Sequence, residues 1–112
     1  MATEIPIDGT RLVFYSHVHA KHEGKLVSEY LLELAKREKF GGGSVFRAVA
    51  GFGRHGVLHE EQFFELADDL PVKVEFLLTT ANAESMLQRV CDAGVDVVYA
   101  RTATSFGLVG NS

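Results

Sequence analysis

The sequence predicts an α+β fold of the ferredoxin-like type, a βαββαβ sandwich in which two helices cover one side of a four-stranded antiparallel sheet. Two observations carry this prediction. Four short runs rich in apolar, β-forming residues begin near residues 11, 45, 72 and 95. A segment with apolar residues at helical spacing follows the first run, and another follows the third. The chain of 112 residues has the length of one domain, so we expect a single domain over residues 1–112.

The first strand is expected at residues 11–18, because the run RLVFYSHV alternates and consists mainly of residues that favour strands. Residues 1–9 before it are polar around Pro6 and Gly9, which predicts a loose N-terminal arm. We expect little function in that arm.

The first helix is expected over residues 26–38. Its apolar residues recur at helical spacing and its charged residues lie off that face. The apolar set is Val27, Tyr30, Leu31 and Leu34, and the charged set is Glu29, Glu33, Lys36 and Arg37. Three glycines at 41–43 follow as a stop signal. The pattern is that of an amphipathic helix packed on a sheet.

A glycine-punctuated stretch joins the second and third strands, which are expected at 45–49 and 72–78. Gly51-Phe52-Gly53 ends the second strand with residues that tolerate positive φ and expose backbone N–H groups, so an anion can bind there. The connection over residues 54–70 is longer than the links of compact domains usually are, which is typical of functional loops. Its apolar residues Phe63, Leu66, Ala67 and Leu70 have helical spacing, so a helix within the loop is one interpretation.

The second helix and the fourth strand complete the pattern. The helix follows N-cap candidates at 79–82, carries apolar residues on one face and ends at Gly94. That face includes Cys91, for which buried packing is favoured over a reactive thiol. The fourth strand is expected at 95–100, and residues 101–112 are small and polar enough to predict a C-terminal tail.

Two helices on one side leave the other face of the sheet uncovered. Strand segments such as 12–15 and 76–78 are apolar on both faces. An uncovered apolar face indicates contact with other subunits.

Composition restricts the class of function. A formal net charge of −4 argues against a nucleic-acid partner, which normally needs a basic surface. Cys91 is the one cysteine, so neither a disulfide framework nor a cysteine metal cluster is available. The first ten residues lack the basic start and apolar core of a signal peptide, and no apolar run has the length of a membrane span. We therefore expect a cytoplasmic protein that is not embedded in a membrane.

The order of motifs around the loop resembles the signal-transduction protein PII. In PII a GFGR turn, a long T-loop and an LPKVKIE strand come in this order, and here GFGRHG, the 54–70 loop and LPVKVEF do. With Gly24 and Lys25 at the start of the first helix, the sequence is most similar to the smaller PII-like proteins of formerly unknown function. The resemblance implies a homotrimer with clefts between subunits, and a β-extension rather than a helix in the T-loop.

The resemblance also implies a nucleotide site in those clefts. In PII the matching glycine turn holds ATP or ADP, which assigns this role to Gly51, Phe52, Gly53 and Arg54, with His55 standing where PII has a glutamine. Further candidates are Leu77 for the adenine pocket and Lys25 and Arg101 for phosphate. Arg47 is also a candidate, since it is a charged residue in an otherwise apolar strand and can point to the cleft. Each of these three cations has an ordinary alternative: a surface or interface ion pair for Arg47, a helix start for Lys25 and a solvated strand end for Arg101.

Two departures from PII change the expected ligand. The lysine that follows the LP pair in PII is replaced by Val72, and the glycine- and lysine-rich B-loop is missing between the second helix and the fourth strand. We therefore expect AMP, ADP or a related adenine nucleotide rather than ATP, with a small anion such as bicarbonate as a possible companion. The resemblance implies that ligand binding changes the order of the loop and thereby regulates a partner, such as a transporter, channel or enzyme.

Histidines provide the main alternative. His17, His19 and His22 form an H-x-H-x-x-H pattern on and after the first strand, and neutral imidazoles bind Zn²⁺, Cu²⁺ or Ni²⁺. CutA, a trimeric relative of PII, has been linked to divalent metals, so a metal-binding trimer is the second hypothesis. Exposed histidines in a polar connection are the ordinary interpretation. An enzyme is not expected, because the sequence contains no nucleophile elbow, P-loop or H-E-x-x-H motif.

Overall fold

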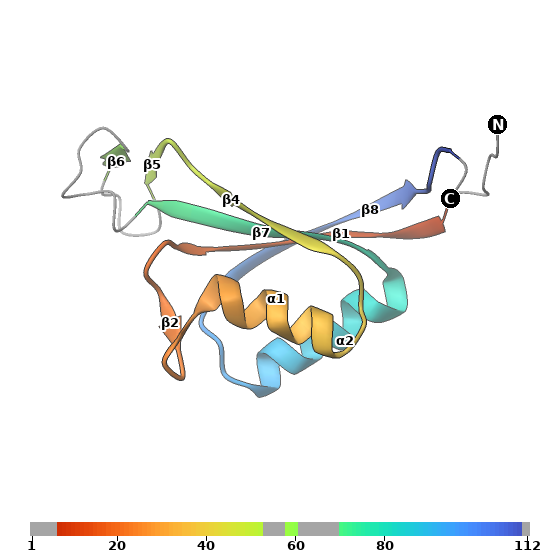
Figure 1. The fold of residues 1–112 in the computed structure, drawn as a ribbon, viewed down its shortest axis with the longest axis horizontal. Coiled ribbons are helices and arrows are strands. Elements are labelled where there is room, and N and C mark those ends of the chain that lie inside the picture. Colours follow the sequence, from red (N-terminus) through yellow and green to blue (C-terminus); the bar gives the residue numbers. More distant parts are fainter. Residues whose placement is uncertain (1–6, 53–57, 61–69, 111–112) are drawn as a thin grey trace.

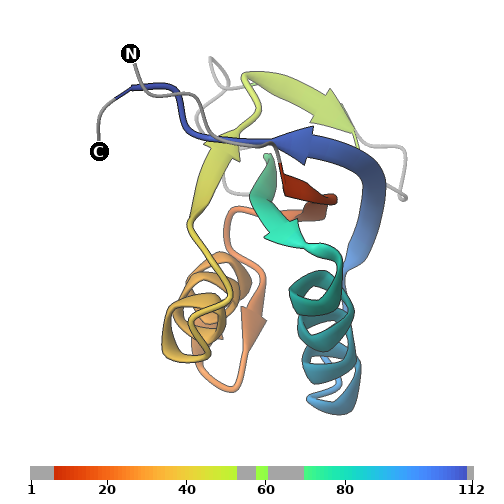
Figure 2. The same ribbon diagram turned by 90° about the vertical axis from the view of Figure 1, so that its right-hand side faces the viewer.

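The computed structural model describes residues 7–52, 58–60 and 70–110, and these form one main antiparallel sheet with two helices. The sheet has the strand order β4-β7-β1-β8 (Figure 1). Its strands are β1 (Ile7–His17), β4 (Gly43–Arg47), β7 (Pro71–Thr79) and β8 (Val98–Phe106). The helices are α1 (Val27–Arg37) and α2 (Thr80–Asp92), and both lie on the same face of the sheet (Figures 1 and 2). The expected ferredoxin-like fold is confirmed.

Two small strand pairs are added to this frame. A hairpin of β2 (Lys21–His22) and β3 (Lys25–Leu26) leads into α1. A second antiparallel pair, β5 (Ala50–Phe52) with β6 (Leu58–Glu60), lies beyond the end of β4 (Figure 1). The described part of the loop is therefore β-structure, as the resemblance implied, while positions 61–69, where helical spacing was noted, lie outside the described residues.

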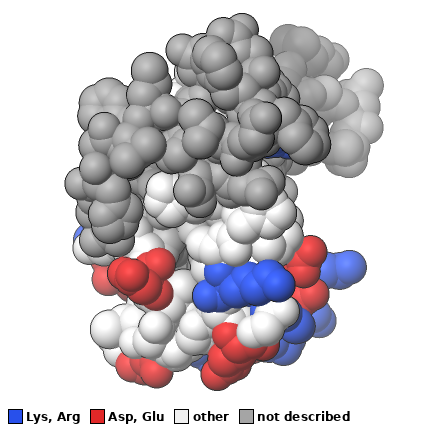
Figure 3. Space-filling view, turned by 90° about the vertical axis from the view of Figure 1, so that its left-hand side faces the viewer, with Lys and Arg blue, Asp and Glu red and all other residues white. Residues whose placement is uncertain are grey.

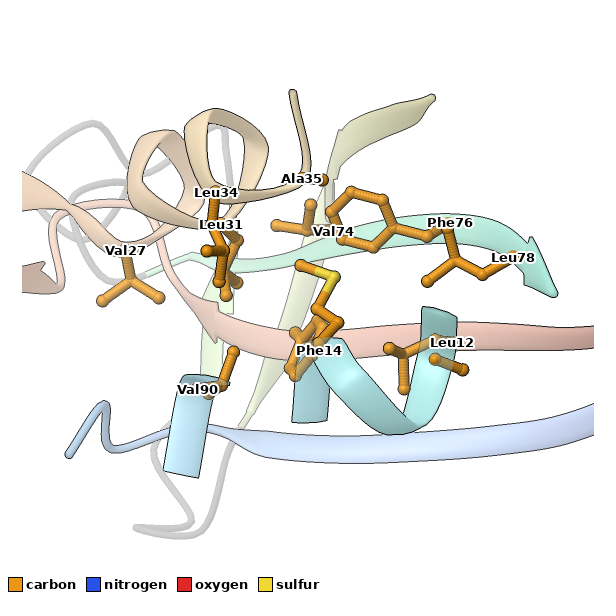
Figure 4. Close-up of a cluster of buried hydrophobic side chains, with 12 residues drawn as sticks. Leu12, Phe14, Val27, Leu31, Leu34, Ala35, Val74, Phe76, Leu78 and Val90 are labelled. Atoms are coloured by element: carbon orange, nitrogen blue, oxygen red, sulfur yellow. The ribbon is translucent and has the colours of Figure 1, made fainter. Parts of the chain in front are cut away.

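The core fills the space between the helices and one face of the sheet (Figure 4). Alternation along the strands produces this arrangement, because every second residue of β1 and β7 points to the helices. Leu12 and Phe14 of β1 stand opposite Phe76 and Val74 of β7, and the two phenylalanine rings meet edge to face with centroids 6.2 Å apart. Leu31 of α1 packs into the same cluster. The alternation of residues along these strands therefore determines which side chains enter the core.

Local signals explain where α2 begins and ends. The Thr79 hydroxyl caps the helix by accepting the backbone N–H of Asn82 at 3.2 Å, and the Asn82 amide donates to the Phe40 carbonyl at 3.2 Å. The helix stops at Gly94, which has φ +72° and donates its N–H to the Cys91 carbonyl. The cap thereby also fixes the segment that leads from α1 into β4.

Three predicted boundaries are wrong, and strand pairing explains them. β8 was expected at 95–100 but runs from Val98 to Phe106, because it pairs along nearly the whole of β1, from Tyr15↔Val98 to Ile7↔Phe106. The same ladder draws Ile7 to Gly9 into β1, so these residues are not a loose arm. β4 ends at Arg47 rather than Val49, since its register with β7 ends opposite Val72, next to Pro71.

The face of the sheet opposite the helices is uncovered, as expected. We call it the open face; it carries the alternate residues Arg11, Val13 and Tyr15 of β1 with their cross-strand neighbours. Large apolar side chains on it, namely Ile7, Tyr15, Phe46, Leu77 and Val98, are 43–47% exposed. Among the described residues, no helix is long and apolar enough to cross a membrane.

Candidate functional site at the base of the loop

A pocket of about 240 Å³ lies where β4 ends and β7 begins. Tyr15, Lys73 and Phe46 stand side by side in register across β1, β7 and β4 and line it on the open face. Arg47 follows Phe46 and, by strand alternation, projects to the other side of this edge strand, so the pocket reaches around the edge of the sheet. Pro71 completes the lining together with Ala48 and Val72.

Backbone hydrogen bonds hold the base of the loop. The Ala48 N–H donates to the Pro71 carbonyl at 2.9 Å on one side of β7, and the Val18 N–H donates to the Leu70 carbonyl at 2.9 Å on the other. Leu70 is fully buried, which anchors the chain as it enters β7. Ala48, Leu70 and Pro71, which flank the loop region, are therefore held in place beside the pocket.

Gly51 is part of strand β5, not of a turn. Its φ is not in the positive range, so the expected use of glycine for a left-handed backbone is wrong at this position. A Cβ there would lie 3.2 Å from the Cγ of Pro71, so close approach to β7 explains the glycine. Gly51 and Phe52 pair with His59 and Leu58 in the β5–β6 ladder. Gly53, Arg54 and His55 lie outside the described residues, and their role in binding stays a prediction.

Glu75, on the open face beside the pocket, contacts two cationic side chains. Arg11 donates to the Glu75 carboxylate at 2.7 Å, and the Lys73 ammonium lies 3.4 Å from the same oxygen and 5.0 Å from the Phe46 ring centroid. Partial desolvation raises the pKa of Glu75, but hydrogen bonds and Coulombic attraction from Arg11 and then Lys73 outweigh it, so the pKa lies below its ordinary value.

The other predicted phosphate ligands are elsewhere in the chain. Lys25 is held by Glu33 of α1, whose hydrogen bond and negative charge raise the pKa of the lysine. Arg101 pairs with Glu84 of α2 at 2.6 Å. Leu77 is exposed on the open face opposite Arg11 and does not line the pocket. Of the described candidates, one chain brings only Arg47 and the β5 residues Gly51 and Phe52 together at the base of the loop.

The end of the molecule that carries the loop is shown in Figure 3. Lysine and arginine side chains lie among aspartates and glutamates on the half of this surface where the helices lie, so both signs are mixed there. The ion pair of Lys25 with Glu33 joins β3 to the middle of α1. A surface of mixed charge is ordinary for a solvated protein, and on such a surface Lys25 has an acidic partner, Glu33.

A second cavity of about 380 Å³ lies between α2 and β8. The Arg101–Glu84 pair and Tyr99 line it, over apolar residues of both elements. Cys91 also lines it and is exposed, so its predicted burial is wrong: the last turn of α2 turns this position away from the core, whereas Val90 packs into it.

The histidine pattern does not form a metal site. Among the described residues, which include His17, His19 and His22, no three histidine, cysteine, aspartate or glutamate side chains are grouped so that they could hold a metal ion. His17 is the last residue of β1, whereas the ring of His22 in β2 packs edge to face on Tyr30 of α1 at 4.9 Å between centroids. The metal hypothesis is therefore not supported by the described residues.

Of the residues that line the pocket, the sequence interpretation named only Arg47. It missed the other six, Tyr15, Phe46, Ala48, Pro71, Val72 and Lys73. Tyr15 and Phe46 were read only as strand formers. Alternation was the signal that could have found three of them. Each of the strands expected at 11–18, 45–49 and 72–78 carries an aromatic or cationic residue on the face opposite the core, namely Tyr15, Phe46 and Lys73. Register, which the sequence does not give, decides that these residues are neighbours.

Comparison with known proteins places this chain in a family. Residues 9–99 match the family model DUF190, described as an uncharacterized ACR. The chain belongs to the DUF190 family. The UPF0166 protein of Aquifex aeolicus is 37% identical over 68 residues, which are 61% of this chain and 65% of that protein. The UPF0166 protein MJ1524 of Methanocaldococcus jannaschii is 30% identical over 79 residues, 70% of this chain and 72% of that protein.

Two solved structures share this fold. CPII, a nitrogen regulatory PII-like protein from Thiomonas intermedia K12, was solved bound to ADP, AMP and bicarbonate; it superposes with a TM-score of 0.66 at 15% identity, covering 93% of this chain and 92% of CPII. A putative PII-like signalling protein from Thermus thermophilus, TTHA0516, gives a TM-score of 0.64 at 15% identity, with 90% and 91% covered. The chain has the PII-like fold.

Proposed function

We propose that this DUF190 protein is a PII-like regulatory protein, and not an enzyme, that binds AMP or ADP at the base of the loop between β4 and β7. The observation that carries the proposal is the pocket lined by Tyr15, Phe46, Arg47 and Lys73, which adjoins Gly51 of the predicted nucleotide motif. CPII, which shares the fold, was solved with ADP and AMP. Fold and pocket chemistry therefore point to the same class of ligand.

The pocket has the chemistry that a nucleotide needs. Its lining is mainly apolar and includes two aromatic rings, which suits an adenine base. Arg47 and Lys73 supply the positive charge for phosphate oxygens, and an arginine guanidinium binds them in a bidentate manner. The described residues present no other charged side chain in this pocket, so these two cations are the ones on which a phosphate-bearing ligand depends.

One chain supplies only part of the site. A volume of about 240 Å³ lies below the roughly 300 Å³ at which ligand pockets usually begin. The pocket also opens on the open face, where exposed apolar side chains favour contact with other copies of the chain. We propose that a homotrimer completes the site from neighbouring subunits, to which Arg101 and Leu77 would contribute.

The preference for AMP or ADP follows from the connection between α2 and β8. Only residues 93–97 separate the end of the helix from the start of the strand, which leaves no room for a long phosphate-binding loop. We propose that the loop at 54–70 carries the response to a partner, such as a transporter, channel or enzyme, and that the ligand acts by binding one loop conformation better than another.

Calorimetric titration with ADP tests the proposal. The wild-type protein is expected to bind ADP saturably, and Arg47→Met is expected to weaken binding about 10- to 100-fold, because it removes a charge-assisted contact to phosphate. Arg89→Met is the matched control: Arg89 is an exposed arginine on α2 that pairs with Glu38 and lies outside the pocket. If Arg47→Met and Arg89→Met bind ADP equally well, or if the wild type binds none, the proposed site is wrong.

A further inference from the structure

Glu75 presents one carboxylate oxygen to two cations on the open face. The Oε1 atom accepts from Arg11 Nη2 at 2.7 Å and lies 3.4 Å from Lys73 Nζ. Arg11, Glu75 and Lys73 therefore carry two positive charges and one negative charge. The one negative charge of Glu75 attracts two positive charges that repel each other, so each cation weakens the hold of the carboxylate on the other.

Lys73 is the cation that is free to change partners. Its 3.4 Å separation from Glu75 exceeds the length of an ordinary N–H···O hydrogen bond, whereas the Arg11 contact is short. Lys73 also lines the pocket at the base of the loop and lies over the Phe46 ring, and Arg11 does not line that pocket. A lysine ammonium on a flexible stem reorients at little energetic cost.

We propose that Lys73 exchanges partners on ligand binding: Glu75 holds it in the empty protein, and an anionic group of the bound ligand takes it over in the pocket. This inference rests on the proposed binding of a phosphate-bearing nucleotide at that pocket. Glu75 then remains compensated by Arg11, so no carboxylate is left without a cation. The exchange moves the positive charge of Lys73 on the open face from Glu75 to the pocket, and this links occupancy of the pocket to the surface that is proposed to meet other subunits.

The exchange gives Glu75 and Arg11 opposite effects on affinity, although neither residue lines the pocket. Glu75 competes with the ligand for Lys73, so its carboxylate weakens binding. Arg11 occupies Glu75 and so lowers its hold on Lys73, which strengthens binding. Both effects act through Lys73 and should disappear when that lysine is absent.

A double-mutant cycle measured by ADP calorimetry tests the inference. Glu75→Gln is expected to tighten ADP binding about two- to fivefold and Arg11→Gln to weaken it by a similar factor, the range expected for competition by an exposed ion pair. In a Lys73→Met background neither substitution should change the ADP dissociation constant. Binding of adenosine, which has no phosphate, should be insensitive to Lys73→Met. Thermal melting of each variant checks that it is folded.

Glu38→Gln is the matched control. The Glu38 side chain is 23% exposed, close to the 25% of Glu75, and it also contacts two cations, Arg37 at 3.5 Å and Arg89 at 2.7 Å. It changes the net charge of the protein by the same amount, so a long-range electrostatic effect would appear equally in both variants.

The possible outcomes separate this inference from the proposed function. If the wild type binds ADP but Glu75→Gln has the same effect with and without Lys73, or no effect, the exchange is refuted and the nucleotide site stands. If the wild type binds no ADP, both the exchange and the proposed function fail. Tightening that requires Lys73, together with weakening by Arg11→Gln, supports the exchange.

Discussion

Substitutions at two adjacent residues of β7 should have different effects, one on the stability of the fold and the other on subunit assembly. Phe76 is buried among the helices and Leu77 is 45% exposed on the open face. Phe76→Ala should lower the free energy of unfolding by about 3–5 kcal/mol for the buried side chain, and by a further ~1 kcal/mol for its edge-to-face contact with Phe14. This is a large part of the roughly 5–15 kcal/mol that a domain has in total.

Leu77→Ala should instead weaken assembly. Covering the exposed 45% of the leucine is worth about 1 kcal/mol per copy, taken from the transfer energy of a whole side chain. A trimer loses this three times, so its overall dissociation constant should rise about 100-fold.

Urea unfolding at several protein concentrations, with sedimentation to measure mass, distinguishes the two effects. Phe76→Ala should lower the unfolding midpoint at every concentration, whereas Leu77→Ala should shift the mass distribution towards monomer at low concentration. A Leu77→Ala protein that keeps the wild-type mass distribution at every concentration would refute the assignment of the open face to subunit contacts.

Three further predictions concern single positions. Because the pKa of Glu75 is lowered in the folded protein, its charge stabilises the fold at pH values above the ordinary pKa of 4.5, and this stabilisation is lost as the pH falls through the lower folded pKa. Thermal melting should therefore show a stability difference between the wild type and Glu75→Gln at neutral pH, and the difference should vanish below the folded pKa. Thr79→Ala should cost about 1 kcal/mol in urea unfolding through loss of the α2 cap, and Thr80→Ala much less. Gly51→Ala, whose Cβ would crowd β7, should weaken ADP binding measured by calorimetry, whereas Gly42→Ala, which has open space, should not; equal affinities would remove Gly51 from the site.

The fold could be predicted because its signals are local. Alternation placed Leu12 and Phe14 on the same face of the first strand, and in the structure this face meets the helices. The end of the second helix was predicted at Gly94, because glycine adopts the positive φ found there without strain. The end of β8 could not be predicted in this way. Its polar run to Phe106 becomes a strand only because β1 offers a partner along that length.

The site could be predicted only in part, because pairing and packing decide it. Arg47 was named because it is a charged residue in an otherwise apolar strand, but Lys73 and Phe46 become neighbours through the β4–β7 register, which the sequence does not state. His22 looked like a metal ligand by spacing, yet its ring packs on Tyr30. Sequence spacing suggests candidate site residues, and the tertiary structure determines which of them lie close together.

A crystal structure of the protein with ADP tests the central claim most directly. The account predicts the adenine ring in the pocket beside Phe46, with phosphate oxygens on Arg47 and Lys73 and with a second copy of the chain closing the site. ADP bound instead within the cavity between α2 and β8 of one chain, without contact to Arg47 or Lys73, would contradict the account.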